Sequence, residues 1–254
     1  KVTSGSNEKT AKFVNNLYLS IIKAGTYLAP SIKVAEASKA IENAQRDINI
    51  SFMNELALIF EKMNIDTNDV IEAASSKWNF LRYKPGLVGG HCIGVDPYYL
   101  IHKSKQLGYN PNIIKSGRKV NDYIPIHICK KLIELLKLNK QKIGDSKVLI
   151  LGLSFKENCP DIRNSKVFDI YNYLKIKGLD VDVFDPVIEM NNVLKSKINL
   201  VEQIDKLVIY DAIILCVAHE EFYNLDFEKF KKSSKKILID IKGVIDKDIT
   251  DYRL

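Results

Sequence analysis

Apolar residues recur at helical spacing through the first half of the chain. Between residues 8 and 23, Ala11, Val14, Leu17 and Ile21 follow one another at intervals of three or four, which predicts an amphipathic helix. The glycine and the proline that come soon afterwards predict a break in the helical structure.

A second helical pattern covers residues 31–63 without a glycine or a proline. Ser31 is of the residue type that caps a helix N-terminus, and at ~1.5 Å per residue this helix would be roughly 50 Å long. Such a length in a soluble domain is typical of a central spine or a dimer interface. Shorter helices are predicted at residues 66–76, 97–107, 112–121 and 124–139, and no strand is predicted before residue 145.

The pattern changes at Lys147, where runs of consecutive apolar residues begin. Strands that alternate with helices indicate right-handed βαβ units and a parallel sheet. We therefore expect an α/β chain, in which an all-α domain is followed by a parallel-sheet domain, with the boundary near 140–145. The expected strands lie at 147–153, 180–186, 211–217 and 236–241, with helical segments between them that include 164–177.

The composition is that of a globular protein, with 254 residues, 46% hydrophobic and 27% charged. No apolar run reaches the ~18–20 residues that a membrane span needs. The net charge is +7, but the lysines are scattered among 31 acidic residues. A nucleic-acid interface would cluster Lys and Arg with aromatic side chains. We therefore expect neither a membrane nor a nucleic acid as partner.

Four cysteines, at positions 92, 129, 159 and 216, are far apart and form no CxxC pair. The spacing therefore offers neither a zinc knuckle nor a thioredoxin motif. We expect no metal site, reduced thiols and a cytoplasmic location.

The first strand of the sheet domain is not followed by a dinucleotide fingerprint. A GxGxxG motif is expected there in a domain that binds NAD, and only Gly152 is present. Open parallel sheets still bind nucleotides at the carboxyl ends of their strands. The sheet domain is thus a candidate nucleotide site, but it is not predicted to be an NAD domain.

Cys92 is the sharpest catalytic candidate, because it lies in the glycine-rich run GGHCIGVD rather than in an apolar pattern. Asp96 follows four residues later and could share a helical face with it. A nucleophile and a small residue in a tight loop are both open interpretations. Cys129 and Cys216 lie in apolar patterns that are typical of a core.

Two pairs of polar residues suggest further chemistry. Lys39 and Asn43 are four residues apart on the long helix and could stabilise an oxyanion together. Lys156 and Arg163 follow the first strand of the sheet domain, where they could reach phosphate or ribose oxygens. Ordinary solvated charges remain the alternative for both pairs.

Three ordered segments carry a resemblance to a known family: VAEASKAIENAQRDINISFMNELA, GGHCIGVDPYYL and FKENCPDIRNS. The chain resembles the UDP-glucose/GDP-mannose dehydrogenase family. It is most similar to the branch that oxidises UDP-N-acetylhexosamines for bacterial capsule, Vi-type and O-antigen polysaccharides. The resemblance runs from Val2 to Leu254, but the family's N-terminal NAD-binding Rossmann domain is missing. It implies a remnant of that domain at 1–30, a helical dimerisation and catalytic domain at 31–143, and a Rossmann-like UDP-sugar-binding domain at 144–254.

The resemblance also implies a reaction, the NAD-dependent four-electron oxidation of a C6 alcohol to a carboxylate. Cys92 matches the nucleophile that forms a thiohemiacetal and then a thioester. Lys39 matches a lysine that stabilises the developing alkoxide, and Asn43 matches its oxyanion-binding and water-positioning partner. Asp96 matches an aspartate that helps to activate water.

Substrate and cofactor contacts follow from the same resemblance. The sugar-binding loop corresponds to residues 83–89, and Arg163 matches a residue that reaches NAD. The implied substrate-binding residues are Tyr83, Lys84, Gly86, Gly89, Phe155, Lys156 and Lys242.

Three other functions remain open at this point. The substrate could be UDP-glucose or GDP-mannose, or the chain as given could be an inactive UDP-binding, dimerising fragment. A cysteine hydrolase would need a histidine base, and nothing designates one of the histidines at positions 91, 102, 127 and 219.

The long helix is expected to form a homodimer. Its apolar residues exceed what one face of a small helical domain can bury. The clearest examples are Ile48, Phe52, Leu56 and Ile59.

Overall fold

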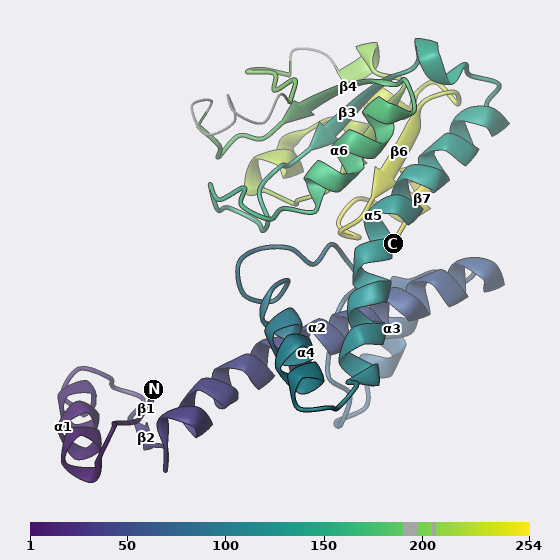
Figure 1. Cartoon of the computed structure of the whole chain (residues 1–254). Helices are drawn as coiled ribbons and strands as arrows, with labels where there is room; N and C mark the ends of the chain where they lie inside the picture. The colour runs from purple at the N-terminus through teal and green to yellow at the C-terminus, as the bar shows by residue number, and fades with distance from the viewer. Residues whose placement is uncertain (190–197, 205–206) are drawn as a thin grey trace.

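A computed structural model describes residues 1–189, 198–204 and 207–254. Figure 1 shows a helical part followed by a sheet part, with one helix running through both. No helix among these residues is both long enough and apolar enough to cross a membrane. The elements of the helical part are β1 (Val2–Thr3), α1 (Glu8–Leu19), β2 (Tyr27–Leu28), α2 (Ile32–Met63), α3 (Thr67–Ser75), α4 (Asp96–Gln106) and α5 (Asn112–Leu138).

Helix α2 begins and ends where its sequence pattern predicts. The Ser31 side chain accepts a hydrogen bond from the Val34 amide at 3.2 Å, which caps the N-terminus. Asn64 ends the helix in a left-handed conformation with φ 57°. The α1, β1 and β2 segments lie at the end of α2 that points away from the sheet (Figure 1).

Two features of the helical part differ from the prediction. Strands β1 and β2 pair in parallel although no strand was predicted before residue 145, because two-residue strands are too short to show an alternating pattern. Helix α5 is continuous although two helices were predicted, at 112–121 and 124–139. Pro125 removes one backbone hydrogen bond inside α5. Ile124 and Ile128, which lie on either side of Pro125 in the sequence, are both fully buried and hold the helix against the core.

The sheet part confirms the predicted fold class, a helical domain followed by a parallel sheet. Five parallel strands lie in the order β4-β3-β5-β6-β7. The short β7 was not predicted, and the helical segment expected between β4 and β5 lies partly outside the described residues. The elements are β3 (Lys147–Leu151), α6 (Val167–Ile176), β4 (Asp180–Phe184), β5 (Ala212–Leu215), α8 (Phe227–Lys231), β6 (Ile237–Asp240) and β7 (Tyr252–Arg253).

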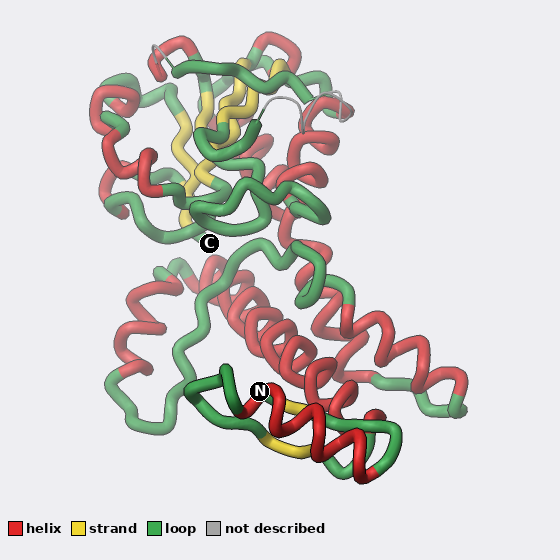
Figure 2. Tube along the Cα trace, turned by 90° about the vertical axis from the view of Figure 1, so that its left-hand side faces the viewer, coloured by secondary structure: helices red, strands yellow, loops and turns green. Residues whose placement is uncertain are grey.

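Both faces of the sheet are buried, and Figure 2 shows the strands between flanking helices. One face packs against α6 and the second half of α5, while the other packs against α8. From α5, Leu132 and Leu136 join this core with no exposed surface. The core therefore crosses the boundary expected near 140–145, so that α5 couples the two parts of the chain.

The strand order indicates where a ligand would bind at the carboxyl end of the sheet. Strand β3 lies between β4 and β5, so the connections that follow β3 lead to neighbours on both of its sides. Open parallel sheets bind ligands next to such a strand. Gly152 follows β3 with φ +88°, and a Cβ atom there would lie 2.5 Å from the Val217 side chain. Glycine is therefore required where the segments after β3 and β5 approach each other.

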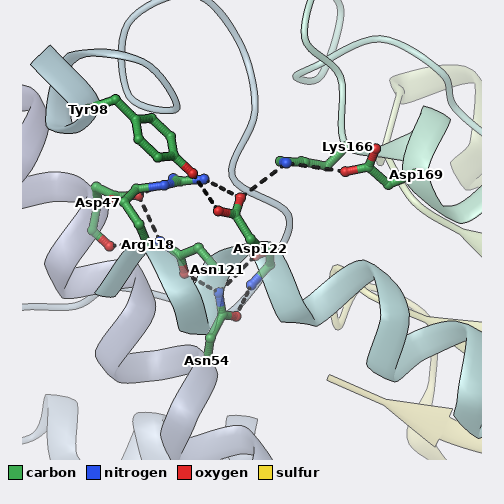
Figure 3. A network of polar contacts seen from close by, with 9 residues as sticks. Asp47, Asn54, Tyr98, Arg118, Asn121, Asp122, Lys166 and Asp169 are labelled. Carbon is green, nitrogen blue, oxygen red and sulfur yellow. Dashed lines mark hydrogen bonds and ion pairs between the residues drawn. The ribbon is translucent and has the colours of Figure 1, made fainter. Parts of the chain in front are cut away.

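A polar network connects α2, α5 and α6 (Figure 3). Arg118 is 3% exposed and donates to Asp47 at 2.6 Å and to Asp122 at 2.5 Å. Lys166, next to α6, pairs with Asp122 at 3.1 Å. Burial raises the pKa of Asp47 in spite of the Arg118 charge. The network ties the helical part to the segment that enters α6.

Arg118→Met tests the contribution of this network to stability. The substitution leaves the Asp47 carboxylate buried without its cation, which should cost about 3–5 kcal/mol in the free energy of unfolding. Urea denaturation measures the loss. Arg163→Met, which removes an exposed arginine, serves as the control and should leave stability nearly unchanged. An Arg118→Met chain as stable as the wild type would contradict the account.

Candidate active site

Two loops meet between the helical part and the sheet. The glycine loop, residues 85–95, precedes α4, and the strand loop, residues 152–166, follows β3. The Gly90 amide donates to the Asn164 carbonyl at 3.2 Å, and a Cβ atom at Gly89 would lie 2.5 Å from that same oxygen. A Cβ atom at Gly90 would lie 2.8 Å from the Phe155 ring. The two glycines thus let the loops touch through their backbones.

A buried asparagine side chain holds the glycine loop in place. Asn54 on α2 donates to the Gly86 carbonyl at 3.0 Å and accepts from the Gly86 amide at 2.8 Å. Its side chain also donates to Asn121 on α5 at 2.8 Å. These two asparagines were not identified from the sequence. Polar residues on the buried faces of long helices were the signal that could have found them.

The structure brings together three of the four predicted catalytic residues. The exposed Cys92 lies one turn before Asp96, whose amide donates to the Cys92 carbonyl at 2.8 Å. Asn43 on α2 is 2% exposed and donates its amide to the Asp96 carboxylate at 2.6 Å. The Asn43 amide and the Asp96 carboxylate thus meet at the N-terminus of α4, and the backbone of Cys92 lies one turn before it.

Lys39, the fourth predicted catalytic residue, points elsewhere. Its side chain is 60% exposed, and its ammonium group pairs with Glu42 at 2.8 Å. The hydrogen bond from Lys39 lowers the pKa of Glu42. The expected joint action of Lys39 and Asn43 therefore requires the ammonium group to leave Glu42.

A second set of predicted residues lines one pocket at the carboxyl end of the sheet. Gly89, Phe155, Lys156 and Lys242 all contribute to its wall. The Lys156 ammonium lies over the Phe155 ring, 5.5 Å from its centroid. Lys242 pairs with Glu157 at 2.6 Å. Lys166 also lines the pocket, although its ammonium group pairs with acidic residues outside the wall. The wall thus carries more positive than negative charge, as a phosphate ligand requires.

Glu157 is held in its charged form. Burial alone would raise the pKa of Glu157, but the charge and the hydrogen bond of Lys242 outweigh burial and lower it. The Lys242 ammonium is fixed at the pocket wall by the same contact.

Arg163 faces a different pocket, together with Gly90, Gly94, Tyr98 and Arg118. Its guanidinium group is 72% exposed and donates to Asp161 at 2.8 Å. This hydrogen bond lowers the pKa of Asp161 to about 2. Arg163 thus lines a different pocket from Lys156 and Lys242.

Tyr83 and Lys84 stand at the start of the predicted sugar-binding segment. Tyr83 is half-buried and Lys84 is exposed. Across the described ranges, neither side chain forms a hydrogen bond or an ion pair. Their contacts therefore neither support nor oppose the substrate-binding role that the resemblance implies.

The histidines do not form a hydrolase relay with Cys92. His91 approaches Asp161 at 3.6 Å and meets the Phe155 ring edge-on. Among the residues that the structure describes, no histidine ring forms a hydrogen bond with the Cys92 sulfur. The same part of the chain contains no group of three or more His, Cys, Asp and Glu side chains that could hold a metal ion.

The sheet part lacks the sequence fingerprint with which a Rossmann domain binds NAD. Only Gly152 follows β3, and a dinucleotide site also needs a free carboxylate after the next strand. Asp185 follows β4, but it is buried and accepts from the amides of Leu153 at 2.7 Å and Ser154 at 2.9 Å. The Asp185 carboxylate therefore binds backbone amides of this chain and is not free to bind a dinucleotide.

Comparisons with known proteins agree with this arrangement. Residues 33–123 match the UDP-glucose/GDP-mannose dehydrogenase family, central domain. Residues 149–247 match the UDP binding domain of the same family. The first match contains Asn43, Cys92 and Asp96, and the second contains Lys156 and Lys242.

Individual relatives cover the whole chain. It is 48% identical to a UDP-N-acetyl-D-glucosamine 6-dehydrogenase of Pseudomonas aeruginosa, over 100% of this chain and 61% of that protein. It is 47% identical to a protein of the same name from Salmonella typhi, over 100% of this chain and 60% of that protein. The structure of a UDP-D-ManNAc dehydrogenase from Pyrococcus horikoshii matches with a TM-score of 0.85 at 28% identity, over 99% of this chain and 58% of that chain.

These matches confirm the resemblance on which the site residues were assigned. The chain spans 61% and 60% of the length of the two curated relatives. Two domains of one family occur here in sequence and on the expected fold. The chain therefore belongs to the UDP-glucose/GDP-mannose dehydrogenase family.

Proposed function

We propose that this chain supplies the covalent-catalysis and UDP-binding parts of an NAD-dependent UDP-N-acetylhexosamine 6-dehydrogenase. The observation that supports the proposal is the backbone contact between the glycine loop, which carries Cys92, and the strand loop, which carries Lys156. The substrate class is supported by two relatives, 48% and 47% identical, that are named UDP-N-acetyl-D-glucosamine 6-dehydrogenases.

In the proposed reaction the C6 alcohol of the sugar is first oxidised to an aldehyde. The Cys92 thiolate attacks C6, a carbon–sulfur bond forms and the carbonyl oxygen becomes the alkoxide of a thiohemiacetal. A second oxidation gives a thioester, and water then breaks the carbon–sulfur bond to release the carboxylate and the thiol. Two NAD⁺ would supply the oxidising power, each accepting one hydride at one of the two oxidations.

Asn43 and Asp96 are proposed to act in the steps that involve oxygen. The Asn43 amide has two N–H groups, of which one is given to Asp96. The second, which has no partner among the described residues, is proposed to donate to an oxyanion. The Asp96 carboxylate is proposed to accept a proton from the attacking water. In this proposal Lys39 leaves Glu42 and stabilises the alkoxide.

The UDP moiety is proposed to bind against the pocket wall that carries Lys156 and Lys242. Lys156 and Lys242 contact the diphosphate, and Phe155 contacts the uridine. The sugar then extends along residues 83–89 toward Cys92. NAD is proposed to be bound mainly by parts of the complete enzyme outside this chain, with Arg163 reaching it from the strand loop. The chain alone is therefore expected to be inactive.

The product, a UDP-linked aminouronic acid, is proposed to serve capsule or O-antigen polysaccharide synthesis in the cytoplasm. All four cysteines are free thiols in the structure. Free thiols, including one that must act as a thiolate, suit a reducing compartment.

A homodimer through α2 is part of the same proposal. Phe52 and Ile59 are 53% and 47% exposed, and the half-buried Leu56 lies between them on one helix face. An exposed apolar face of this kind on a 32-residue helix suits a second copy of the chain.

Cys92→Ser in the complete enzyme should abolish formation of the uronic acid, because a serine hydroxyl is a far weaker nucleophile toward the aldehyde. UDP-sugar binding should remain within about threefold, since Cys92 lies outside the pocket wall. Coupled NADH absorbance and calorimetry measure the two properties. Cys159→Ser, in the strand loop, is the matched control and should keep wild-type turnover. Unchanged turnover in Cys92→Ser would remove Cys92 from the mechanism.

Lys156→Ala should weaken the binding of UDP to this chain roughly tenfold or more, because one charge-assisted phosphate contact is lost. NAD should bind undetectably or very weakly. Isothermal calorimetry measures both ligands, with the exposed Lys105→Ala variant as control. Clear binding of NAD without binding of UDP would mean that the sheet part is assigned to the wrong nucleotide.

Phe52→Asp should convert the dimer to a monomer, because it places a charge in the centre of the apolar face of α2. Light scattering gives the mass in solution. Leu107→Asp, at an exposed apolar residue outside α2, should leave the dimer intact. A wild-type chain that is monomeric at all accessible concentrations would refute the proposed interface.

A further inference from the structure

The position of Lys156 depends on a short turn, residues 154–158, at the start of the strand loop. Among the described residues its ammonium group has no carboxylate partner and contacts only the Phe155 ring. The side chain itself is therefore weakly restrained, and the backbone of the turn decides where it begins. Asn158 closes the turn in a left-handed conformation with φ 52°.

One buried imidazole contacts both ends of this turn. His219 follows β5 and has no exposed surface. Its Nδ1 accepts the amide hydrogen of Asn158 at 3.0 Å. Its Nε2 lies 3.1 Å from the hydroxyl oxygen of Ser154 and 3.1 Å from Oδ2 of Asp185. The ring thus bridges the first and last residues of the turn.

These contacts define the protonation state of the ring. The backbone amide of Asn158 can only donate, so Nδ1 carries a lone pair and the single ring proton is on Nε2. That proton is given to Asp185 and Ser154. The Ser154 hydroxyl in turn donates to the carbonyl oxygen of Lys156 at 3.0 Å. His219 is therefore connected to the Lys156 carbonyl through Ser154, and it also holds the end of the turn at Asn158.

Asp185 fixes the ring in this state. Its carboxylate also accepts the amides of Leu153 and Ser154. Burial alone would raise the pKa of Asp185, but the hydrogen bonds from His219 and the two amides lower it. A charged carboxylate beside Nε2 favours the proton at that nitrogen and leaves Nδ1 free for Asn158.

We propose that neutral His219 is a positioning residue that shapes the 154–158 turn and so places Lys156 for the phosphates of UDP. The inference rests on the proposed function in one respect, the role of Lys156 in binding phosphate. Ser154, His219 and Asp185 do not form a catalytic triad, because the hydroxyl and the carboxylate both contact the same ring nitrogen.

Two substitutions test the contacts of the two ring nitrogens of His219 separately. His219→Asn keeps an acceptor near the position of Nδ1, and His219→Gln keeps a donor near the position of Nε2. Calorimetry with UDP should show affinity within about threefold of wild type for His219→Asn. For His219→Gln, which leaves the Asn158 amide without an acceptor, the affinity should fall by at least tenfold.

Thermal unfolding of the two variants, with the core control Ile214→Val, accounts for any general loss of stability. The proposal expects His219→Asn and His219→Gln to unfold at similar temperatures while their UDP affinities differ. Affinities that fall equally in both variants, in parallel with their unfolding temperatures, would reduce His219 to a structural role and overturn the proposal.

Nitrogen NMR of the wild-type chain provides a readout that does not depend on UDP. The His219 ring should show a protonated Nε2 and an unprotonated Nδ1, and His219→Gln should shift the Asn158 amide far more than His219→Asn does. A protonated Nδ1, or equal shifts in both variants, would overturn the proposal even if the wild-type chain failed to bind UDP. Absence of UDP binding together with the expected spectra would count against the proposed function alone.

Discussion

The close approach of two backbones is the constraint on which the site depends. Where Gly90 donates to the carbonyl oxygen of Asn164, neither glycine of the pair 89–90 leaves room for a side chain. This contact joins a loop that belongs to the helical part to a loop that belongs to the sheet. Because one loop carries Cys92 and the other carries Lys156, a change in the contact would alter the distance between the proposed nucleophile and the proposed phosphate contact.

Buried polar groups hold each side of that contact in place. Asn54 fixes the glycine loop at Gly86, and the Arg118 network fixes the end of the strand loop through Lys166. At the other end of the strand loop, His219 contacts the turn that contains Lys156. Each of these groups is costly to bury unless its partners are present, so the site is specified by polar contacts rather than by apolar packing alone.

The sequence predicted the elements whose signals are local and periodic, and it missed those that depend on tertiary contacts. The Ser31 cap and the long apolar period were sufficient for α2, whereas the continuous α5 depends on burial around Pro125. Asp47 and Asn54 are seven residues apart on one buried face, a spacing that could have indicated the polar network. Helical spacing alone placed Lys39 with Asn43, but a neighbouring glutamate takes the ammonium group.

The proposed function requires that Cys92 binds the substrate covalently and that Asp96 promotes its release by water. In the complete enzyme, Asp96→Asn should slow hydrolysis, so that the thioester accumulates during turnover with UDP-N-acetylglucosamine and NAD⁺. Acid quenching followed by peptide mass spectrometry locates the adduct. The account predicts a UDP-sugar acyl adduct on the peptide that contains Cys92 and on no other cysteine. A free thiol at Cys92 while the enzyme still releases the uronic acid would contradict it.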